Sequence, residues 1–303
     1  MNITCPLCKK NSNRILFDDM LNNGQGISIV KCKSCGHNYT YYEVEIDFDK
    51  LYSEGSYELQ DTRKSIFYSI QKYEYTKVLS SLKKMEVKSI LDFGSGKGIF
   101  LNFSKEAFFD VAGVETSKDR ADYSKKFFDL NINTNFYNGG NIFNNFFDCI
   151  TLFHVLEHIS MPKQLIENLA KDNLSEKGVL LIEVPNFYSW QAKLAGKNWL
   201  HNDVPRHVNH FSYKSLESFL NSLGFFVIKT ENFSFHLGII GMVQSLLGLF
   251  GYKGSIIEDI KTRKKKIIIF TLLLFPIAFV LELIASLFRK GGVIRLYSIR
   301  KNG

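Results

Sequence analysis

The sequence of 303 residues has few cysteines and lacks a secretory signal, an internal repeat and a low-complexity tract. Four of the five cysteines form two tight pairs, which is not the pattern of a disulfide framework, and residues 1–10 lack the basic and apolar regions of a signal peptide. We therefore expect a reducing, cytoplasmic compartment. Apolar residues make up 45% and charged residues 22% of the chain, which excludes wholesale disorder and fits one large α/β domain with appendages.

Acidic residues are nearly absent from residues 261–301, where Glu282 stands alone among ten lysines and arginines. This stretch carries a charge of +9, which leaves −1 for the rest of a chain whose net charge is +8. A basic chain suggests nucleic acid, a membrane surface or an acidic substrate as partner. Because the charge is concentrated near the C-terminus, we expect that part of the chain to make the contact.

Residues 87–233 alternate between strand-like and helix-like segments, which predicts a parallel sheet with helices on both faces. The predicted strands are Val87–Phe93, Val111–Glu115, Asn135–Tyr137, Phe147–Phe153, Val179–Val184 and Phe225–Thr230, with Val293–Arg300 at the end of the chain. Three further zones surround this α/β region. We expect a metal-binding module at 1–45, a helical connector or lid at 46–86 and an apolar insertion at 234–291, after which 292–303 rejoin the sheet.

A glycine-rich loop follows the first of these strands. The loop Gly94–Gly98 holds three glycines between Asp92 and a helix-like segment, so its backbone can turn tightly and approach a ligand at the helix N-terminus. A dinucleotide-binding fingerprint would need its third glycine at Ile99 instead. Glu115, at the end of the second strand, can accept hydrogen bonds from both hydroxyls of a ribose. Together the loop and the acid indicate a ribose-bearing ligand.

These segments resemble the class I S-adenosylmethionine-dependent methyltransferases of the small-molecule type. Asp92-Phe93-Gly94-Ser95-Gly96-Lys97-Gly98 resembles their first motif, and His154-Val155-Leu156-Glu157-His158 is similar to the exit of their fourth strand. The resemblance covers 87–233 and 292–300, and it implies a Rossmann-like, seven-stranded methyltransferase sheet. It also implies S-adenosyl-L-methionine as cofactor, with the binding residues Asp92, Gly94, Gly96, Gly98, Glu115, Asn141 and His154.

The resemblance assigns a role to each of these side chains. Asp92 is expected near the methionine moiety and Glu115 at the ribose. Asn141, or the neighbouring Ile142, stands where the family has an adenine contact, usually an acid, and His154 is expected to line the methyl-donor cleft. In related enzymes, aromatic residues before the first helix often form a lid over the cofactor, so Tyr52 and Tyr57 are lid candidates here; ordinary surface tyrosines are the alternative.

Methyl transfer is an in-line displacement in which the enzyme aligns donor and acceptor and can remove a proton from the acceptor. Histidine is the natural base at neutral pH, so His154, His207 and His210 are the candidate catalytic residues. The latter two lie in residues 205–212, a Pro-Arg-His-x-x-His-Phe-Ser segment that is similar to a loop of this methyltransferase group. We expect Arg206, His207 and His210 to contact the substrate, with Arg206 binding a phosphate or carboxylate. The alternative is a structural role for the histidines.

Two CxxC pairs, 23 residues apart, suit a closed tetrahedral metal site with a structural role. We expect Zn²⁺, rather than iron, on the four thiolates of Cys5, Cys8, Cys32 and Cys35. The pairs resemble the zinc-ribbon module that precedes some sugar C-methyltransferases and certain ribosomal RNA methyltransferases. Eight acidic residues within 1–60 argue against contact with a phosphate backbone.

The apolar insertion contains Ile267–Phe288, in which Glu282 is the only charged residue. As a helix it would be about 33 Å long, enough for a bilayer core. If Phe225–Thr230 and Val293–Arg300 are neighbours in one sheet, both ends of the insertion stay on one side of a membrane, which excludes a single crossing. A hairpin that crosses twice and a helix pair that lies in one leaflet remain. We favour membrane attachment through 235–290 over a soluble dimer interface.

We therefore predict a methyltransferase with a zinc ribbon, peripheral or monotopic on the inner face of the cell membrane. The expected acceptor is a small or lipid-linked molecule, such as a sugar, a glycan-lipid or a quinone-like compound, methylated on oxygen or carbon; nucleic acid is not expected as a partner. One rival is an RNA methyltransferase that uses the ribbon for binding, which does not explain the apolar segment. The other is a catalytically silent membrane adaptor, which does not explain the intact glycine loop with Asp92 and Glu115.

Overall fold

The computed structural model of the chain describes residues 4–21, 24, 26–47, 61, 63 and 65–301. The chain forms two compact units. The first comprises Met1–Ile46, Pro185–Leu216 and Glu231–Ile294, and the second comprises Asp47–Val184, Glu217–Thr230 and Arg295–Gly303. The cysteine pairs, the histidine-rich loop (residues 205–212) and the apolar insertion thus belong to the first unit, and the glycine loop belongs to the second.

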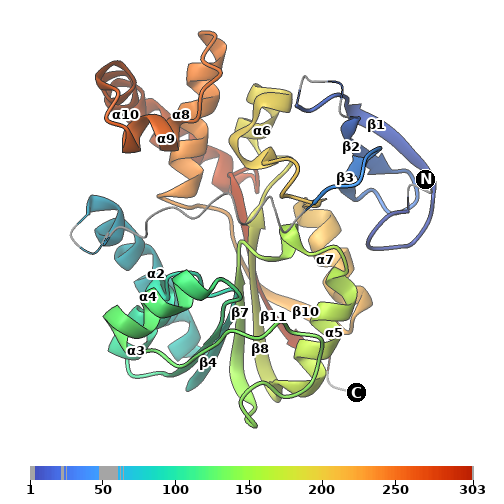
Figure 1. The fold of residues 1–303 in the computed structure, drawn as a ribbon, viewed down its shortest axis with the longest axis vertical. Coiled ribbons are helices and arrows are strands. Elements are labelled where there is room, and N and C mark those ends of the chain that lie inside the picture. Colours follow the sequence, from blue (N-terminus) through green and yellow to red (C-terminus); the bar gives the residue numbers. More distant parts are fainter. Residues whose placement is uncertain are drawn as a thin grey trace. The chain divides into compact units, whose positions relative to one another are not determined.

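The main sheet has seven strands (Figure 1). They are β4 (Ser89–Phe93), β5 (Asp110–Val114), β6 (Ile132–Asn133), β7 (Phe147–Phe153), β8 (Leu174–Pro185), β10 (Phe225–Glu231) and β11 (Val293–Arg300). Their order is β10-β11-β8-β7-β4-β5-β6, and the pairs β4–β5, β4–β7, β5–β6 and β7–β8 are parallel. The predicted Rossmann-like α/β fold class is confirmed.

The third strand is shifted from its predicted position. We predicted it at Asn135–Tyr137, but β6 forms at Ile132–Asn133 and pairs with Gly113 and Val114 of β5. The reason is packing. Ile132 is buried in an apolar cluster against α4, whereas Phe136, the apolar residue at the centre of the predicted strand, is 79% exposed.

The last strand rejoins the sheet between β10 and β8. Immediately after β11, the N–H of Lys301 donates a hydrogen bond of 2.8 Å to the carbonyl oxygen of Gly224, the residue before β10. The end of β11 therefore lies beside the start of β10, and the two strands are antiparallel neighbours, as predicted. The insertion between them leaves the sheet and returns to it at the same edge.

Helices pack on this sheet through apolar faces. They are α2 (Ile66–Lys84), α3 (Ile99–Glu106), α4 (Lys118–Phe128), α5 (Pro162–Asp172) and α7 (Tyr213–Ser222). Val78 and Leu82 of α2 and Phe100 of α3 share a buried cluster with Ile90 of β4. Because α3 begins directly after the glycine loop, this packing fixes the loop at the carboxyl end of β4.

The first unit contains a second, smaller sheet. Its strands are β1 (Asn13–Phe17), β2 (Ile27–Cys32), β3 (Asn38–Tyr42) and β9 (Asn209–His210), paired antiparallel in that order. Strand β9 comes from the histidine-rich loop after β8. The N-terminal sheet is therefore completed by a segment that lies about 170 residues later in the chain.

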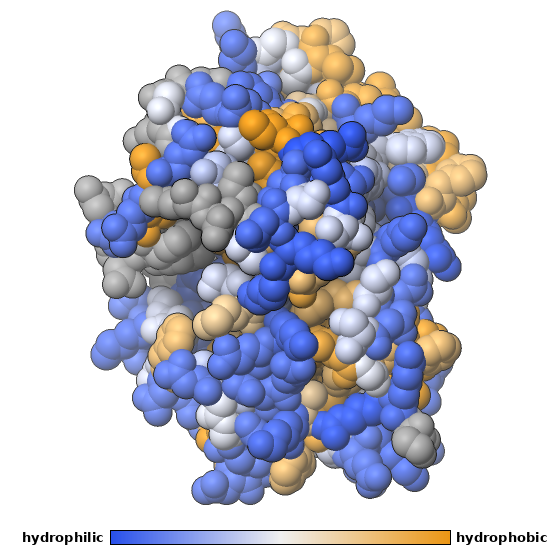
Figure 2. Space-filling model, turned by 90° about the vertical axis from the view of Figure 1, so that its right-hand side faces the viewer, coloured by the Kyte–Doolittle hydropathy of each residue, from blue (hydrophilic) through white to orange (hydrophobic). Residues whose placement is uncertain are grey.

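The insertion forms a pair of apolar helices, α8 (Leu237–Leu249) and α10 (Lys265–Leu287), joined through the short helix α9 (Ile256–Lys261), and it packs beside α6 (Trp190–Ala195). Helix α10 is long and apolar enough to cross a membrane, and only 17% of its most apolar window is buried. Its buried residues, Thr271, Ala278, Glu282 and Ala285, form one narrow stripe. Figure 2 shows apolar side chains at the top and upper right of the face that it draws.

Candidate cofactor, metal and acceptor sites

The glycine loop turns from β4 into α3 through left-handed backbone conformations. Gly94, Gly96 and Gly98 have φ angles of +79°, +55° and +70°, which L side chains rarely adopt. A Cβ on Gly98 would lie 2.6 Å from a methyl group of Leu130, whereas a Cβ on Gly96 would have no atom within 4 Å. Gly96 therefore faces open space, and a ligand can approach the backbone there at the N-terminus of α3.

Glu115 is held against this loop by two backbone hydrogen bonds. Its Oε2 accepts from the N–H of Gly96, and its Oε1 accepts from the N–H of Ser117, both at 2.8 Å. Each carboxylate oxygen keeps a second lone pair for another donor. The carboxylate is thus fixed in orientation and can still accept hydrogen bonds from a pair of hydroxyl groups.

Asp92 is a buried carboxyl group at the end of β4. Its Oδ1 accepts a hydrogen bond of 2.6 Å from the hydroxyl of Thr151 on β7. Burial raises the pKa of Asp92 to about 7; the hydrogen bond from Thr151 opposes the rise and the nearby charge of Glu115 adds to it. Two acids beside an open glycine loop favour a cationic ligand, and such a ligand would lower the pKa of Asp92 when it binds.

His154 follows β7 and has a φ angle of +55°. Its Nε2 lies 2.9 Å from an oxygen of Glu183 and its Nδ1 lies 3.3 Å from an oxygen of Glu157, and both carboxylates are buried. Burial lowers the pKa of His154, but the hydrogen bonds to Glu157 and Glu183 outweigh it and raise the pKa to about 10. At neutral pH the ring is a cation that donates both N–H groups, so it has no lone pair with which to accept a proton.

Glu183 connects His154 to a buried ion-pair network. The guanidinium of Arg295, on β11, donates from Nε to Glu183 at 2.5 Å and lies 3.2 Å from a carboxylate oxygen of Glu74 on α2. All three side chains are buried. Because each charge has an opposite partner within hydrogen-bond distance, the network holds the exit of β8 and the position of His154 in place.

The structure does not bring Asn141 to the glycine loop. The side-chain amide of Asn141 donates to the carbonyl oxygens of Asn145 and Asp172, and its side-chain oxygen accepts from the N–H of Asn145. Asn145 precedes β7 and Asp172 precedes β8, so these partners lie at the amino edge of the parallel sheet. The glycine loop lies at the opposite, carboxyl edge. Asn141 thus holds a loop together rather than lying beside Gly96.

The four paired cysteines converge. The sulfur atoms of Cys5 and Cys35 are 3.6 Å apart, as are those of Cys8 and Cys32, and all four lie within 4.8 Å of one another. A tetrahedral Zn²⁺ with bonds of about 2.3 Å would place its sulfur ligands about 3.8 Å apart, so the donor set fits this ion. The residue after each pair, Lys9 or Gly36, has positive φ, and its N–H donates a hydrogen bond of 2.9 Å to the carbonyl oxygen of the first cysteine of that pair.

His210 and His207 lie inside the first unit rather than on an open surface. The hydroxyl of Thr40 donates to the carbonyl oxygen of His207 at 2.6 Å and lies 2.9 Å from Nε2 of His210. Burial lowers the pKa of His210 well below its usual value, so its ring is neutral. The Nδ1 of His207 lies 2.8 Å from the carbonyl oxygen of His201 and therefore carries the proton. These contacts tie the loop to β3 and leave neither ring open to a substrate in the first unit.

The other predicted residues have simpler surroundings. The guanidinium of Arg206 is exposed and pairs with the carboxylate of Asp203 at 2.7 Å, which partly neutralises it. Cys149 is buried in the sheet core, as predicted. Tyr52 and Tyr57, the predicted lid, lie outside the described residues.

Sequence reasoning missed the partners of the site. Thr151, Glu183 and Arg295 lie in strands, and the apolar pattern of these strands indicated only that the strands belong to the core. In each case the signal in the sequence was a polar residue between apolar neighbours of a strand. All three are polar groups at buried positions, and such groups need partners.

The strand order, the glycine loop beside two acids and the left-handed turn into α3 together define a class I S-adenosylmethionine-dependent methyltransferase. The sequence matches the family described as "Methyltransferase domain" over residues 67–230, more than half of the chain, and the protein belongs to that family. No curated protein matches the chain.

Solved structures share this fold. The putative sarcosine dimethylglycine methyltransferase from Galdieria sulphuraria is 14% identical with a TM-score of 0.51, over 77% of this chain and 85% of that one. The plantazolicin methyltransferase BpumL, in complex with a pentazolic desmethylPZN analog and SAH, is 16% identical with a TM-score of 0.50, over 84% and 92% of the two chains. At these identities the likeness shows the fold and says nothing of the acceptor.

Proposed function

We propose that this protein transfers the methyl group of S-adenosyl-L-methionine to an oxygen or carbon atom of a small, lipid-linked acceptor at the cytoplasmic face of a membrane. The observation that carries the cofactor part is the site at Gly96. There an open backbone amide region, an oriented carboxylate at Glu115 and a buried carboxyl group at Asp92 lie together.

Each part of this site fits one part of the cofactor. Asp92 faces the cationic methionine end, where its carboxylate form binds positive charge. Glu115 accepts hydrogen bonds from the ribose hydroxyls. A side chain at Gly96 would fill the space through which the cofactor passes. Asn141 is not part of this proposal, because it lies at the other edge of the sheet.

The bound cofactor supplies an electrophilic methyl group, and the chain supplies alignment. His154 is held as a cation by Glu157 and Glu183, so we assign it a positioning role: it fixes the exits of β7 and β8, which border the cofactor site. It does not act as a base. The proposed role of Zn²⁺ on Cys5, Cys8, Cys32 and Cys35 is structural, because four protein ligands leave no open position for chemistry.

The apolar insertion supports attachment to a membrane. Leu272 and Leu287 of α10 are 68% and 76% exposed, and Phe250, after α8, is 82% exposed. Surface of this kind is costly in water over so long a stretch. Lysines and arginines flank α10 at both ends, where they can contact anionic headgroups.

The lengths of the two helices favour one leaflet over a double crossing. Helix α8 has 13 residues and is about 20 Å long, whereas a bilayer core is about 30 Å thick. Helix α10, at about 34 Å, is long enough, but its partner is too short to return across the membrane. The basic residues near the turn between them would also have to cross. We therefore propose a monotopic hairpin.

The activity is tested with the full-length protein in detergent, incubated with deuteromethyl-labelled cofactor and a membrane lipid extract. Mass spectrometry should find one lipid fraction that gains the labelled methyl group. Gly96→Arg should abolish the product, while Gly224→Ala, a change at another positive-φ glycine with open space around it, should not. Labelled product in an RNA fraction and not in lipid would contradict the proposed acceptor class.

Attachment is tested by flotation with vesicles of phosphatidylcholine and an anionic phospholipid. Leu272→Glu together with Leu287→Glu should move most of the protein out of the vesicle fraction, because two charges would have to enter the apolar layer. Phe108→Glu is the matched control, since Phe108 is 95% exposed and lies outside the insertion. Equal flotation of all three proteins would rule out α10 as the attachment surface.

A further inference from the structure

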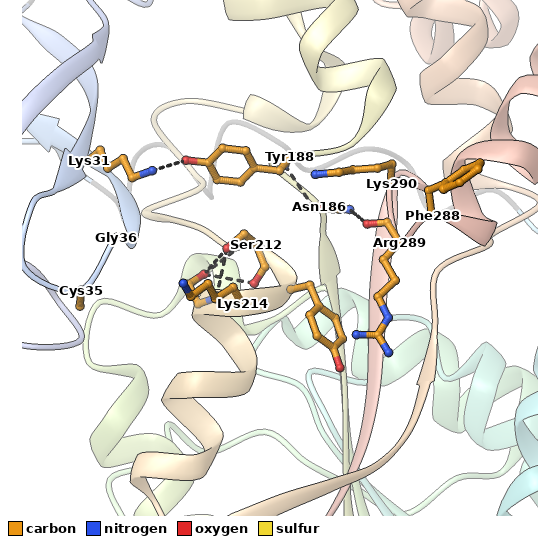
Figure 3. Close-up of a pocket in the computed structure, with 12 residues that line it drawn as sticks. Lys31, Cys35, Gly36, Asn186, Tyr188, Ser212, Lys214, Phe288, Arg289 and Lys290 are labelled. Carbon is orange, nitrogen blue, oxygen red and sulfur yellow. Dashed lines mark hydrogen bonds between the residues drawn. The ribbon is translucent and has the colours of Figure 1, made fainter.

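The first unit contains a pocket of about 440 Å³ that none of the roles above uses. It is formed where four segments meet: the ribbon around its second cysteine pair, the turn after β8, the amino end of α7, and the exit of α10 (Figure 3). Its size is in the range of small-molecule sites. The pocket is therefore large enough for a polar headgroup.

The charge of this pocket has one sign. Four cationic side chains line it: Lys31, Lys214, Arg289 and Lys290. Within the part of the chain that the structure describes, no acidic residue lines the pocket, and none of the four cations forms an ion pair. Four neighbouring cations without acids repel one another, so binding of an anionic ligand would lower their electrostatic energy.

Two of the cations are held in place by aromatic rings. The ammonium group of Lys31 donates a hydrogen bond of 2.8 Å to the hydroxyl of Tyr188, and Figure 3 shows Lys290 reaching toward Tyr188 from the other side. The guanidinium of Arg289 lies 4.5 Å from the centre of the Tyr213 ring. Stacking of this kind fixes a cation and leaves its edge donors available.

The backbone of the pocket is also fixed. The side-chain amide of Asn186 donates to the carbonyl oxygens of Arg289 and Gly291 at 3.3 and 2.9 Å, and its side-chain oxygen accepts from the N–H of Tyr188. The N–H of Trp190 donates to the carbonyl oxygen of Lys290. One asparagine thus sets the turn that presents two of the four cations.

The amino end of α7 adds positive potential. Ser212 caps this ten-residue helix, because its hydroxyl oxygen accepts a hydrogen bond from the N–H of Ser215 at 3.1 Å. The positive end of the helix dipole therefore lies at the pocket, beside Lys214.

An apolar surface begins at the pocket wall. Phe288 lines the pocket and is 66% exposed, and it directly follows α10, whose exposed leucines form the proposed membrane face. A ligand that is anionic at one end and apolar at the other matches this arrangement. We propose that the pocket binds the phosphate or diphosphate group of a lipid-linked acceptor, whose tail lies along α10. This inference rests on the proposed function and names the acceptor class.

The test measures binding to the full-length protein in detergent by calorimetry, with farnesyl diphosphate, farnesol and inorganic diphosphate as probes. Farnesyl diphosphate should bind at least tenfold more tightly than either of the other two, because each lacks one half of the recognised ligand. The double variant Lys214→Gln and Arg289→Gln should weaken the binding of farnesyl diphosphate by at least tenfold. Lys171→Gln, which removes an exposed lysine on α5, is the matched control and should leave binding unchanged.

Three results would overturn the inference. Equal affinity for farnesol and farnesyl diphosphate would show that the charge of the diphosphate does not contribute to binding. Equal affinity for inorganic diphosphate would show a free-phosphate site with no part for the lipid. Tighter binding of a short single-stranded RNA that competes with diphosphate and is lost in the double variant would assign the pocket to nucleic acid. Binding of S-adenosylmethionine is measured in parallel, so that failure of the pocket and failure of the methyltransferase proposal are told apart.

Discussion

The buried carboxyl group of Asp92 should make cofactor affinity depend on pH. Its pKa in the free protein is about 7, raised from 3.8 mainly by burial. Below pH 7 the group is mostly protonated and neutral, and only the carboxylate attracts the cationic end of S-adenosylmethionine. We therefore expect affinity to rise with pH through 7.

The magnitude follows from the fraction of carboxylate. If only that form binds tightly, the apparent dissociation constant is increased by a factor of about 11 at pH 6 and about 1.1 at pH 8, a difference of roughly tenfold. Thr151→Val removes the hydrogen bond that lowers the pKa, so it should move the midpoint of the profile above 7. Asp92→Asn should bind weakly at both pH values.

Calorimetric titration with S-adenosylmethionine from pH 6 to pH 8 measures the effect. The α-amino group of the ligand titrates near pH 8 and affects binding to both proteins. At each pH the affinity of the wild type is therefore divided by that of Asp92→Asn, so that the ligand's own titration cancels. A ratio that does not change between pH 6 and pH 8, in protein that remains folded, would refute the reasoning about Asp92.

Three further predictions concern other parts of the chain. Gly96→Ala and Gly224→Ala should each lower the free energy of unfolding by about 1–2 kcal/mol, because both glycines have positive φ and open surroundings. Only Gly96→Ala should also weaken cofactor binding. Thermal unfolding measures the first effect and calorimetry the second. Elemental analysis should find one Zn²⁺ per chain, lost in Cys8→Ala and kept in Cys149→Ala, and an unchanged metal content in Cys8→Ala would contradict the four-cysteine site. Arg295→Leu should lower the free energy of unfolding by about 3–5 kcal/mol, since it leaves Glu74 and Glu183 buried without their cation. Arg120→Leu, at an exposed position, should leave the free energy of unfolding nearly unchanged. Equal midpoints of chemical denaturation for these two variants would show that the network contributes nothing to stability.

The sheet could be predicted from the sequence because its information is local. Alternating apolar segments and the glycine loop after β4 each fit within a short window, and only the shortest strand, β6, was misplaced. The placement of Asn141 could not be predicted in this way. It depends on hydrogen bonds to Asp172, about 30 residues away, which hold its loop at the amino edge of the sheet.

The residues of the candidate site could likewise be predicted only where their signals are local in the sequence. The glycines and Glu115 are recognisable by their spacing, whereas the charge state of His154 depends on Glu183, which comes from another strand. The histidines of the loop after β8 suggested a substrate site, but pairing of that loop with β3 buries them. The anionic subsite expected at Arg206 is instead proposed in the pocket of four cations, which come from three segments and share no motif.

The pairing of β9 with β3 has a consequence for how the N-terminal module can be separated from the enzyme. The ribbon cannot be exchanged or trimmed like an independent tag, because the carbonyl oxygen of His207 and the side chain of Asn209 take their hydrogen bonds from Thr40 and His37. A chain without residues 1–46 would expose these groups and release the loop. During synthesis, more than 160 further residues must be added after β3 before β9 can complete this sheet. The final folding of the module therefore depends on the chain that follows it.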